Sequence, residues 1–143
     1  MARRKGSLVQ AAIAVIEHHG RYLVSRRKAH DNLGGLWEFP GGKRRAGESW
    51  EACLRRELAE ELGVVVKVAE RLMPLRFRYP DRTVSLEVFR CTVASGDPRP
   101  LDCQEVRWVT SAQLRRLRVP PANHPLVEFL TRDKGCVEIP VVI

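Results

Sequence analysis

The feature that most constrains this chain is a glycine-bounded stretch in which charges and leucines stand at fixed spacings. It fits the pattern G-x5-E-x7-R-E-L-x-E-E-x-G, which begins at Gly42 and ends at Gly63. The pattern predicts a glycine loop followed by an amphipathic helix. Ser49 suits the N-cap because its hydroxyl can accept a backbone N–H that a first helical turn leaves unpaired. Gly63 suits the left-handed position just beyond a helix C-terminus.

The expected helix carries an apolar stripe with carboxylates at its edge. Apolar side chains recur at every fourth position and share one helix face: Trp50, Leu54, Leu58 and Leu62. Glu57, Glu60 and Glu61 are spaced i, i+3 and i+4, so they are neighbours that repel one another. Helical geometry puts Glu57 and Glu61 at the rim of the stripe, where an uncompensated charge near the protein body is costly.

A divalent cation relieves this electrostatic conflict. Oxygen ligands without a nearby histidine or thiol favour Mg²⁺, with Mn²⁺ as the alternative, over zinc. The competing interpretation is a solvated acidic helix face that Arg55 and Arg56 neutralise, and the complete spacing pattern argues against it. The usual ligand of such a cation is a phosphorylated substrate.

The stretch resembles the signature motif of the Nudix hydrolases and matches it at every defined position. The surrounding chain, from about Leu8 to Leu130, resembles their MutT branch, the pyrophosphohydrolases that clear oxidised guanine nucleotides from the nucleotide pool. Four further segments carry this similarity in the same order: SRR at 25–27, WEFPGGK at 37–43, YPDR at 79–82 and PPAN at 120–123. The PPAN segment is the one that points to MutT.

The resemblance implies an α/β fold, the Nudix α/β/α sandwich with a mixed sheet between helices. It also implies a Mg²⁺-dependent enzyme that hydrolyses nucleoside triphosphates, in particular 8-oxo-dGTP, to a monophosphate and pyrophosphate. A broader triphosphate pyrophosphohydrolase that takes dCTP or CTP is the first alternative. An RNA-cap-type pyrophosphohydrolase and a non-catalytic nucleotide-sensing or RNA-binding domain are weaker ones. The compact C-terminus argues against the former and the intact carboxylate set against the latter.

Size and composition indicate a single domain over residues 1–143. The chain is 44% hydrophobic and 29% charged, as in an ordinary globular protein with its own core. We expect that core over about residues 8–132 and a C-terminal extension over 133–143, which forms an edge strand or a subunit contact. The basic N-terminus lacks a signal-peptide core, and the sequence has no apolar run of membrane-spanning length. We therefore expect a cytoplasmic protein.

The net charge of +8 predicts an anionic partner, and a nucleoside triphosphate is sufficient to explain it. The chain has no dense lysine tract and no interleaving of basic and aromatic residues that would bind single strands. We expect no stable nucleic-acid partner, and either a monomer or a homodimer. The cysteines are scattered without a C-x-x-C pair, which predicts reduced, mostly buried thiols: Cys53, Cys91, Cys103 and Cys136.

Apolar runs and turn residues predict a mixed sheet with helices on both faces. We expect strands over 8–16, 21–26, 64–68, 71–79, 83–93 and 106–109, with hairpin turns at 18–20 and 80–82. Besides the central helix, we expect a short helix over 111–117 with Ser111 near its cap, and a last helix over about 125–131. Residues 29–36, with two consecutive glycines, are expected to form a loop.

The resemblance assigns the metal site and the catalytic groups. The metal ligands are Glu57, Glu60, Glu61, the carbonyl of Gly41, and Glu105, which we expect on the loop before Val106. Glu57 is the leading general base, with Glu61 and Glu105 as alternatives. Arg56 is expected to orient Glu60 or Glu48 through a bidentate ion pair. Glu48 itself is either an anchor of the loop or an outer metal group.

Substrate-binding residues follow from the same similarity: Arg27, Phe39, Gly42, Lys43, Arg82 and Asn123. Arg27 is the expected phosphate contact, and Phe39 contacts the base or belongs to the core. The amide of Asn123 offers a donor and an acceptor that suit the N7–H and O6 edge of 8-oxoguanine; the alternative is a helix cap. Asn32 departs from the family pattern, which has a phosphate-contacting histidine in this loop.

Overall fold

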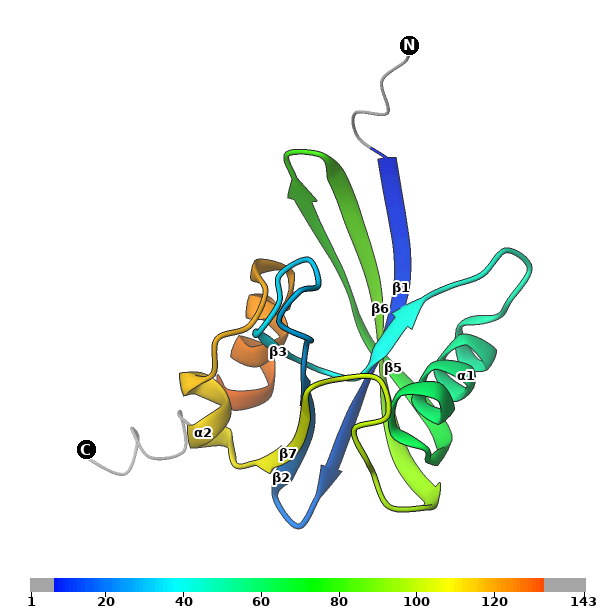
Figure 1. Ribbon diagram of the computed structural model, residues 1–143, viewed down its shortest axis with the longest axis vertical. Coiled ribbons are helices and arrows are strands. Elements are labelled where there is room, and N and C mark those ends of the chain that lie inside the picture. The colour runs from blue at the N-terminus through cyan, green and yellow to red at the C-terminus, as the bar shows by residue number, and fades with distance from the viewer. Residues whose placement is uncertain (1–6, 133–143) are drawn as a thin grey trace.

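The fold is organised around β1 (Ser7–His18), whose run from Ala11 to Ile16 is buried on both faces. A strand buried on both faces belongs in the middle of a sheet. In the computed structural model, which describes residues 7–132, β1 lies at the centre of a seven-stranded sheet with the order β3-β2-β1-β6-β5 (Figure 1). β4 pairs with β1, and β7 pairs with β2.

The remaining elements come after β1 along the chain. They are β2 (Arg21–Arg26), β3 (Trp37–Glu38), β4 (Gly41–Lys43), α1 (Trp50–Leu62), β5 (Val65–Tyr79), β6 (Arg82–Ser95), β7 (Glu105–Val109), α2 (Ser111–Arg116) and the 3₁₀ helix η1 (Pro121–Asn123), followed by helical residues 124–132. β1 runs parallel to β6, whereas its pairings with β2 and β4 are antiparallel. The sheet is therefore mixed, as expected.

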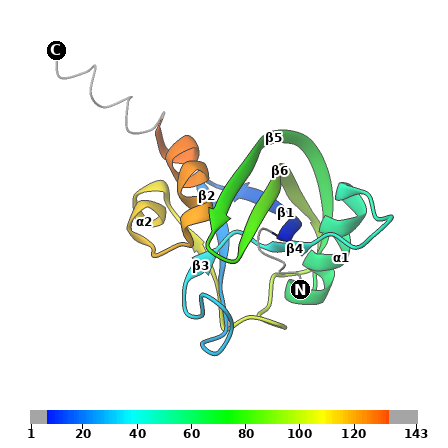
Figure 2. The same ribbon diagram turned by 90° about the horizontal axis from the view of Figure 1, so that it is seen from above.

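Alternate residues of β1 face two separate hydrophobic cores. Ala12, Ala14 and Ile16 pack with the leucine stripe of α1. Ala11, Ile13 and Val15 pack on the other face, with α2, η1 and the helix over 124–132. Figure 2 shows α1 and α2 on opposite sides of the sheet. The predicted α/β/α sandwich is confirmed.

Ser49 and Gly63 are confirmed as the residues that cap α1, and the N-cap of α2 lies one residue before Ser111. The Ser49 hydroxyl accepts the Ala52 N–H at 3.0 Å, and Gly63 is left-handed with φ of 71°. The cap of α2 is Thr110 instead of Ser111, because Thr110 forms a reciprocal capping box with Gln113.

Two expectations about strands need correction. The segments 64–68 and 71–79 form one strand, β5, since register shifts between Val68 and Met73 let a single strand follow β6. Glu105 is the first residue of β7 and not part of a loop, because it pairs with Arg26 of β2. The suggested strand over 135–143 lies outside the described residues. None of the helices within residues 7–132 has the length and apolar character needed to cross a membrane.

Candidate active site

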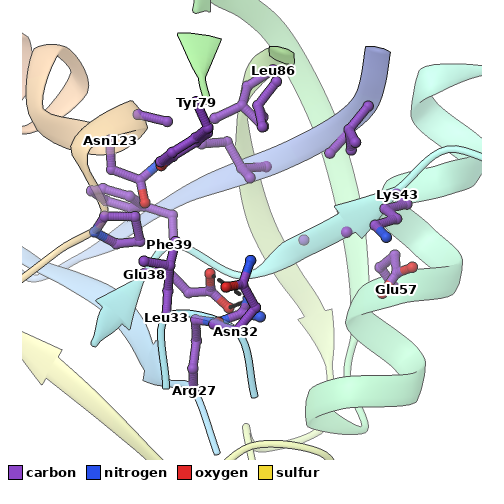
Figure 3. A pocket seen from close by; sticks show the side chains of 18 of the residues that line it. Arg27, Asn32, Leu33, Glu38, Phe39, Lys43, Glu57, Tyr79, Leu86 and Asn123 are labelled. Atoms are coloured by element: carbon purple, nitrogen blue, oxygen red, sulfur yellow. Dashed lines mark hydrogen bonds and ion pairs between the residues drawn. The ribbon is translucent and has the colours of Figure 1, made fainter. Parts of the chain in front are cut away.

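A cavity of about 440 Å³ lies where β4, β1, β6 and η1 meet. Most of the predicted site residues line it: Arg27, Phe39, Gly41, Gly42, Lys43, Glu57, Glu61, Arg82 and Asn123. Figure 3 shows Lys43 and Glu57 at one end of the cavity, and Asn123 with Tyr79 at the other. The structure thus joins the glycine loop and helix of the signature motif to the PPAN segment, about sixty residues further along the chain.

Glu57 and Glu61 form the acidic end of this cavity. Removal from water raises the pKa of Glu61 well above the ordinary carboxyl range, and the neighbouring Glu57 carboxyl adds to the effect through a hydrogen bond and its charge. The Gly41 N–H hydrogen-bonds Glu61 and partly opposes the rise. A Cβ on Gly42 would overlap the Glu57 carboxyl, so the absence of a side chain at Gly42 lets Glu57 lie against β4. The Glu61 carboxyl therefore holds its proton to a higher pH than an ordinary carboxyl does.

Arg56 ties the glycine loop to these carboxylates. Its Nε and Nη2 donate to the two oxygens of Glu48 at 2.6 and 2.8 Å. Nη1 donates to Glu57 at 2.9 Å, and Nη2 also reaches the Lys43 carbonyl at 3.0 Å. Of the two partners expected for the bidentate pair, Glu48 is the one found. The hydrogen bond from Arg56, followed by the Arg45 N–H, lowers the pKa of Glu48 to about 2. In this structure Glu48 anchors the loop.

Glu60 and Glu105 do not line the cavity. The Glu60 side chain is 51% exposed and pairs with Arg45 at 3.8 Å and Arg56 at 3.5 Å. Glu105 pairs with Arg107 at 2.8 Å and lies 3.9 Å from Arg26. Residues 7–132 contain no preformed group of three or more histidine, cysteine or acidic side chains able to hold a metal ion. Both glutamates would have to leave these arginines to serve as ligands, so their metal roles stay predictions.

The far end of the cavity is aromatic with one buried amide. Asn123 is 5% exposed, and its side-chain amide has no hydrogen-bond partner within residues 7–132. Figure 3 places that amide beside Tyr79 and above Phe39. No capping bond from Asn123 is found in the described chain, which removes the main support for the alternative role as a helix cap. Phe39 belongs to the core and also forms part of the cavity wall, so its core role is confirmed and its contact with the base stays a prediction.

Arg27 is held in the cavity by Glu38, a residue that the sequence reasoning missed. Nη1 of Arg27 lies 3.2 and 3.3 Å from the two Glu38 oxygens, and its Nε donates to the Asn32 carbonyl at 2.7 Å. Burial raises the pKa of Glu38, and the charge of Arg27 opposes the rise. The place of Glu38 in the sequence could have indicated its role. Glu38 stands between the buried residues Trp37 and Phe39, where a charged side chain needs a partner.

Arg82 lines the cavity next to the aromatic end. Its guanidinium lies 4.5 Å from the centre of the Tyr79 ring and donates to Asp81 at 3.0 Å. Tyr79 and Leu86 are further lining residues that the sequence reasoning did not single out. They come from β5 and β6, so only the pairing of these two strands brings them to the site.

One cavity thus contains two neighbouring carboxyl groups beside a glycine loop, two arginines and the amide of Asn123. The chain belongs to the NUDIX domain family, whose model matches residues 11–129. It is a MutT-like Nudix hydrolase, an enzyme that acts on pyrophosphate bonds. The non-catalytic alternative is thereby set aside.

Two relatives and one solved structure are similar to this chain over most of its length. An 8-oxo-dGTP diphosphatase of Haemophilus influenzae is 33% identical over 127 residues, which is 88% of this chain and 93% of the relative. A CTP pyrophosphohydrolase of Escherichia coli is 31% identical over 121 residues, with 85% and 90% covered. The solution structure of the E. coli ORF135 protein superimposes with a TM-score of 0.75 at 30% identity and covers 89% of this chain and 92% of that one.

Proposed function

We propose that this chain is a Mg²⁺-dependent pyrophosphohydrolase that converts 8-oxo-dGTP to 8-oxo-dGMP and pyrophosphate. The observation that carries the proposal is a single cavity with the Glu57–Glu61 pair at one end and, at the other, the Asn123 amide, which has no hydrogen-bond partner in the described part of the chain. The first relative named above is an 8-oxo-dGTP diphosphatase. That name and the chemistry of the two ends support the same substrate.

The acidic end fits a hard divalent cation. Glu57 and Glu61 offer oxygen ligands, and both burial and the Glu57 carboxyl raise the pKa of Glu61, so a cation would take the place of the Glu61 proton. The Gly41 carbonyl, Glu60 and Glu105 are the further ligands we propose, with Mn²⁺ as an alternative to Mg²⁺. When bound, the cation polarises a phosphoryl oxygen and lowers the pKa of a coordinated water.

The chain's own residues would bind the triphosphate and place the proton acceptor. Arg27 and Lys43 line the cavity and carry the positive charge that phosphate oxygens require. Arg56 holds the Glu57 carboxylate at 2.9 Å, which makes it a positioning residue. Glu57 is the first candidate to accept the proton of the attacking water, and Glu61 and Glu105 remain the alternatives.

Recognition of the base is assigned to Asn123. Its amide oxygen would accept from N7–H of 8-oxoguanine while its amide nitrogen donates to O6. Unmodified guanine has no hydrogen on N7, so it would leave one of these two bonds unmade inside a buried pocket. Leaving a buried polar group unsatisfied costs about 1–3 kcal/mol, which is enough to separate the two nucleotides.

The test is a panel of 8-oxo-dGTP, dGTP, dCTP and CTP with Mg²⁺, with products identified by chromatography. We expect the highest kcat/KM on 8-oxo-dGTP, with pyrophosphate as product. Asn123→Ala should lower kcat/KM for 8-oxo-dGTP by about 10- to 100-fold more than for dGTP. The matched control is Asn32→Ala, since Asn32 lines the same cavity but contacts Arg27 through its backbone carbonyl. Orthophosphate release, or an equal loss on both guanine nucleotides, would contradict the proposal.

A cytidine nucleotide is the second candidate, favoured by the similarity to a CTP pyrophosphohydrolase. The Asn123 amide also complements cytosine, which offers an N4–H₂ donor. A higher kcat/KM on dCTP or CTP than on 8-oxo-dGTP in the same panel would establish this alternative.

A further inference from the structure

A second cavity, of about 430 Å³, lies on the opposite face of β3 from the first cavity. Consecutive strand residues point to opposite faces, so Glu38 lines the first cavity and Trp37 lines the second. Its other walls come from the loop residues 34–36, from Arg26 at the end of β2, and from residues 116–118 at the end of α2. None of these walls belongs to the signature motif.

Arginine side chains dominate this cavity. Arg26, Arg116 and Arg118 line it, and a fourth, Arg107, stacks on the Trp37 ring at 4.6 Å. Among the described residues, no carboxylate lines it. Glu105 pairs with Arg107 at 2.8 Å and lies 3.9 Å from Arg26. Within residues 7–132, Arg116 and Arg118 have no ion pair or hydrogen bond through their side chains. The four arginines at this cavity therefore carry more positive charge than the nearby Glu105 neutralises.

The walls are fixed independently of any ligand. The Trp37 N–H donates to the Arg118 carbonyl at 2.8 Å, which joins β3 to the segment after α2. The Arg26 Nε donates to the Gly35 carbonyl at 3.0 Å, which joins β2 to the loop. Because these contacts hold the backbone beneath the guanidinium groups, less order has to be imposed when an anion binds.

We propose that this second cavity is a binding site for a small phosphorylated anion of the di- or triphosphate type. Planar guanidinium groups match phosphate oxygens bidentately, and several of them around one cavity suit an anion with several phosphoryl groups. The arginines converge on one cavity instead of forming a groove along the surface with stacked aromatics, which a nucleic-acid strand would need. This proposal is independent of the substrate proposed for the first cavity.

The experiment uses the full ¹⁵N-labelled chain without divalent cation, titrated with inorganic tripolyphosphate at physiological ionic strength. We expect shifts of the Gly34 and Gly35 amides and of the Trp37 indole N–H, which report on the second cavity. The amides of Gly41 and Gly42 report separately on the first. Binding of tripolyphosphate is thus followed without turnover. The result can be interpreted even if 8-oxo-dGTP is not the substrate of the first cavity.

Variants decide whether the site is specific. Arg116→Ala combined with Arg118→Ala should weaken tripolyphosphate binding at the Gly34–Trp37 signals by at least about tenfold. The matched control combines Arg78→Ala with Arg115→Ala, two exposed arginines that line neither cavity, and it should keep the affinity within about twofold. Equal weakening in both double variants, or no shift of the Gly34–Trp37 signals, would overturn the proposal. Tighter binding of a single-stranded oligonucleotide to these signals would also overturn it.

Discussion

Arg56 is the side chain on which the acidic end of the site depends. It contacts Glu48, Glu57 and the Lys43 carbonyl together, and only 17% of the side chain is exposed. The hydrogen bonding of Arg56 to the Glu48 carboxylate is the main reason that the pKa of Arg56 is raised. A lysine could not reproduce this pattern, because it presents one point charge in place of a planar fork. Arg56 thus fixes the loop and the first candidate base in a single network.

The ion pair of Glu48 with Arg56 predicts a specific pH dependence of stability. The pKa of Glu48 is about 2 in the folded chain and about 4.3 in an unfolded one. A carboxyl with a lowered folded pKa stabilises the protein above the unfolded value, and this stabilisation is lost as the pH falls toward the folded pKa. Glu48→Gln should therefore lose less free energy of unfolding than the wild type between about pH 5 and about pH 2.5.

Urea unfolding at both pH values measures this difference. Glu51→Gln is the matched control, because Glu51 also pairs with an arginine, Arg55 at 2.9 Å, but is 50% exposed. Its change with pH should follow the wild type closely, since exposed pairs contribute little. If Glu48→Gln and the wild type lost the same free energy on acidification, the Glu48 pair would not be a source of acid sensitivity.

At the scale of elements, β4 positions the glycines that admit Glu57. The two glycines of this strand have different neighbours. A Cβ on Gly42 would meet the end of the Glu57 side chain, whereas a Cβ on Gly41 would meet the Ala12 carbonyl of β1. Gly41 also has φ of 153°, which side chains disfavour. A substitution at Gly41 and one at Gly42 should therefore impair the protein for different reasons.

We expect Gly42→Ala to fold but to displace the Glu57 carboxylate, with a loss of about 100-fold in kcat/KM, as a small misplacement of a catalytic group can cause. Gly41→Ala should instead lower the free energy of unfolding, because the β1–β4 backbone has to move. Thermal unfolding and steady-state kinetics on both variants separate these effects. Full activity in Gly42→Ala would show that Glu57 does not need its present position.

Elements with local signals could be predicted, and features that depend on distant partners could not. Ser49 and Gly63 lie next to the groups that they cap, so the sequence alone places the ends of α1. The continuity of β5 depends on bulges opposite β6, which no local pattern specifies. Likewise, Glu38 was missed because its partner Arg27 comes from the segment just after β2, about ten residues earlier in the chain. The second cavity joins residues 34–37 to residues 116–118, about eighty positions apart.

Across the whole molecule, in a chain with a net charge of +8, the two cavities differ in how their charges are arranged. Arg27, Lys43 and Arg82 line the first cavity together with Glu38, Glu57 and Glu61, so side chains of both charges meet there. The second cavity is lined by arginines without a carboxylate among the described residues. Part of the excess positive charge thus lies away from Glu57 and Glu61, the carboxylates that we propose as cation ligands.

The raised pKa of Glu61, together with the proposed metal site, predicts that the stability of the fold depends on metal and pH. A carboxyl whose folded pKa is raised, as that of Glu61 is, adds stability below its unfolded pKa, near about 4.3. That stability is lost as the pH rises through the folded pKa. A cation replaces the retained proton, so Mg²⁺ should stabilise the protein more at higher pH.

The measurement is the Tm by calorimetry, in EDTA and in millimolar MgCl₂, at about pH 6 and about pH 8.5. We expect the Mg²⁺-dependent increase in Tm to be larger at the higher pH by about 3 °C or more. Glu61→Gln carries no proton to release, so it should be more stable than the wild type in EDTA at the higher pH and should lose the pH dependence of the Mg²⁺ effect. A Mg²⁺ effect of equal size at both pH values in the wild type would mean that Glu61 does not exchange a proton for the cation, and the ligand set would then have to be reassigned to the exposed Glu60 and Glu105.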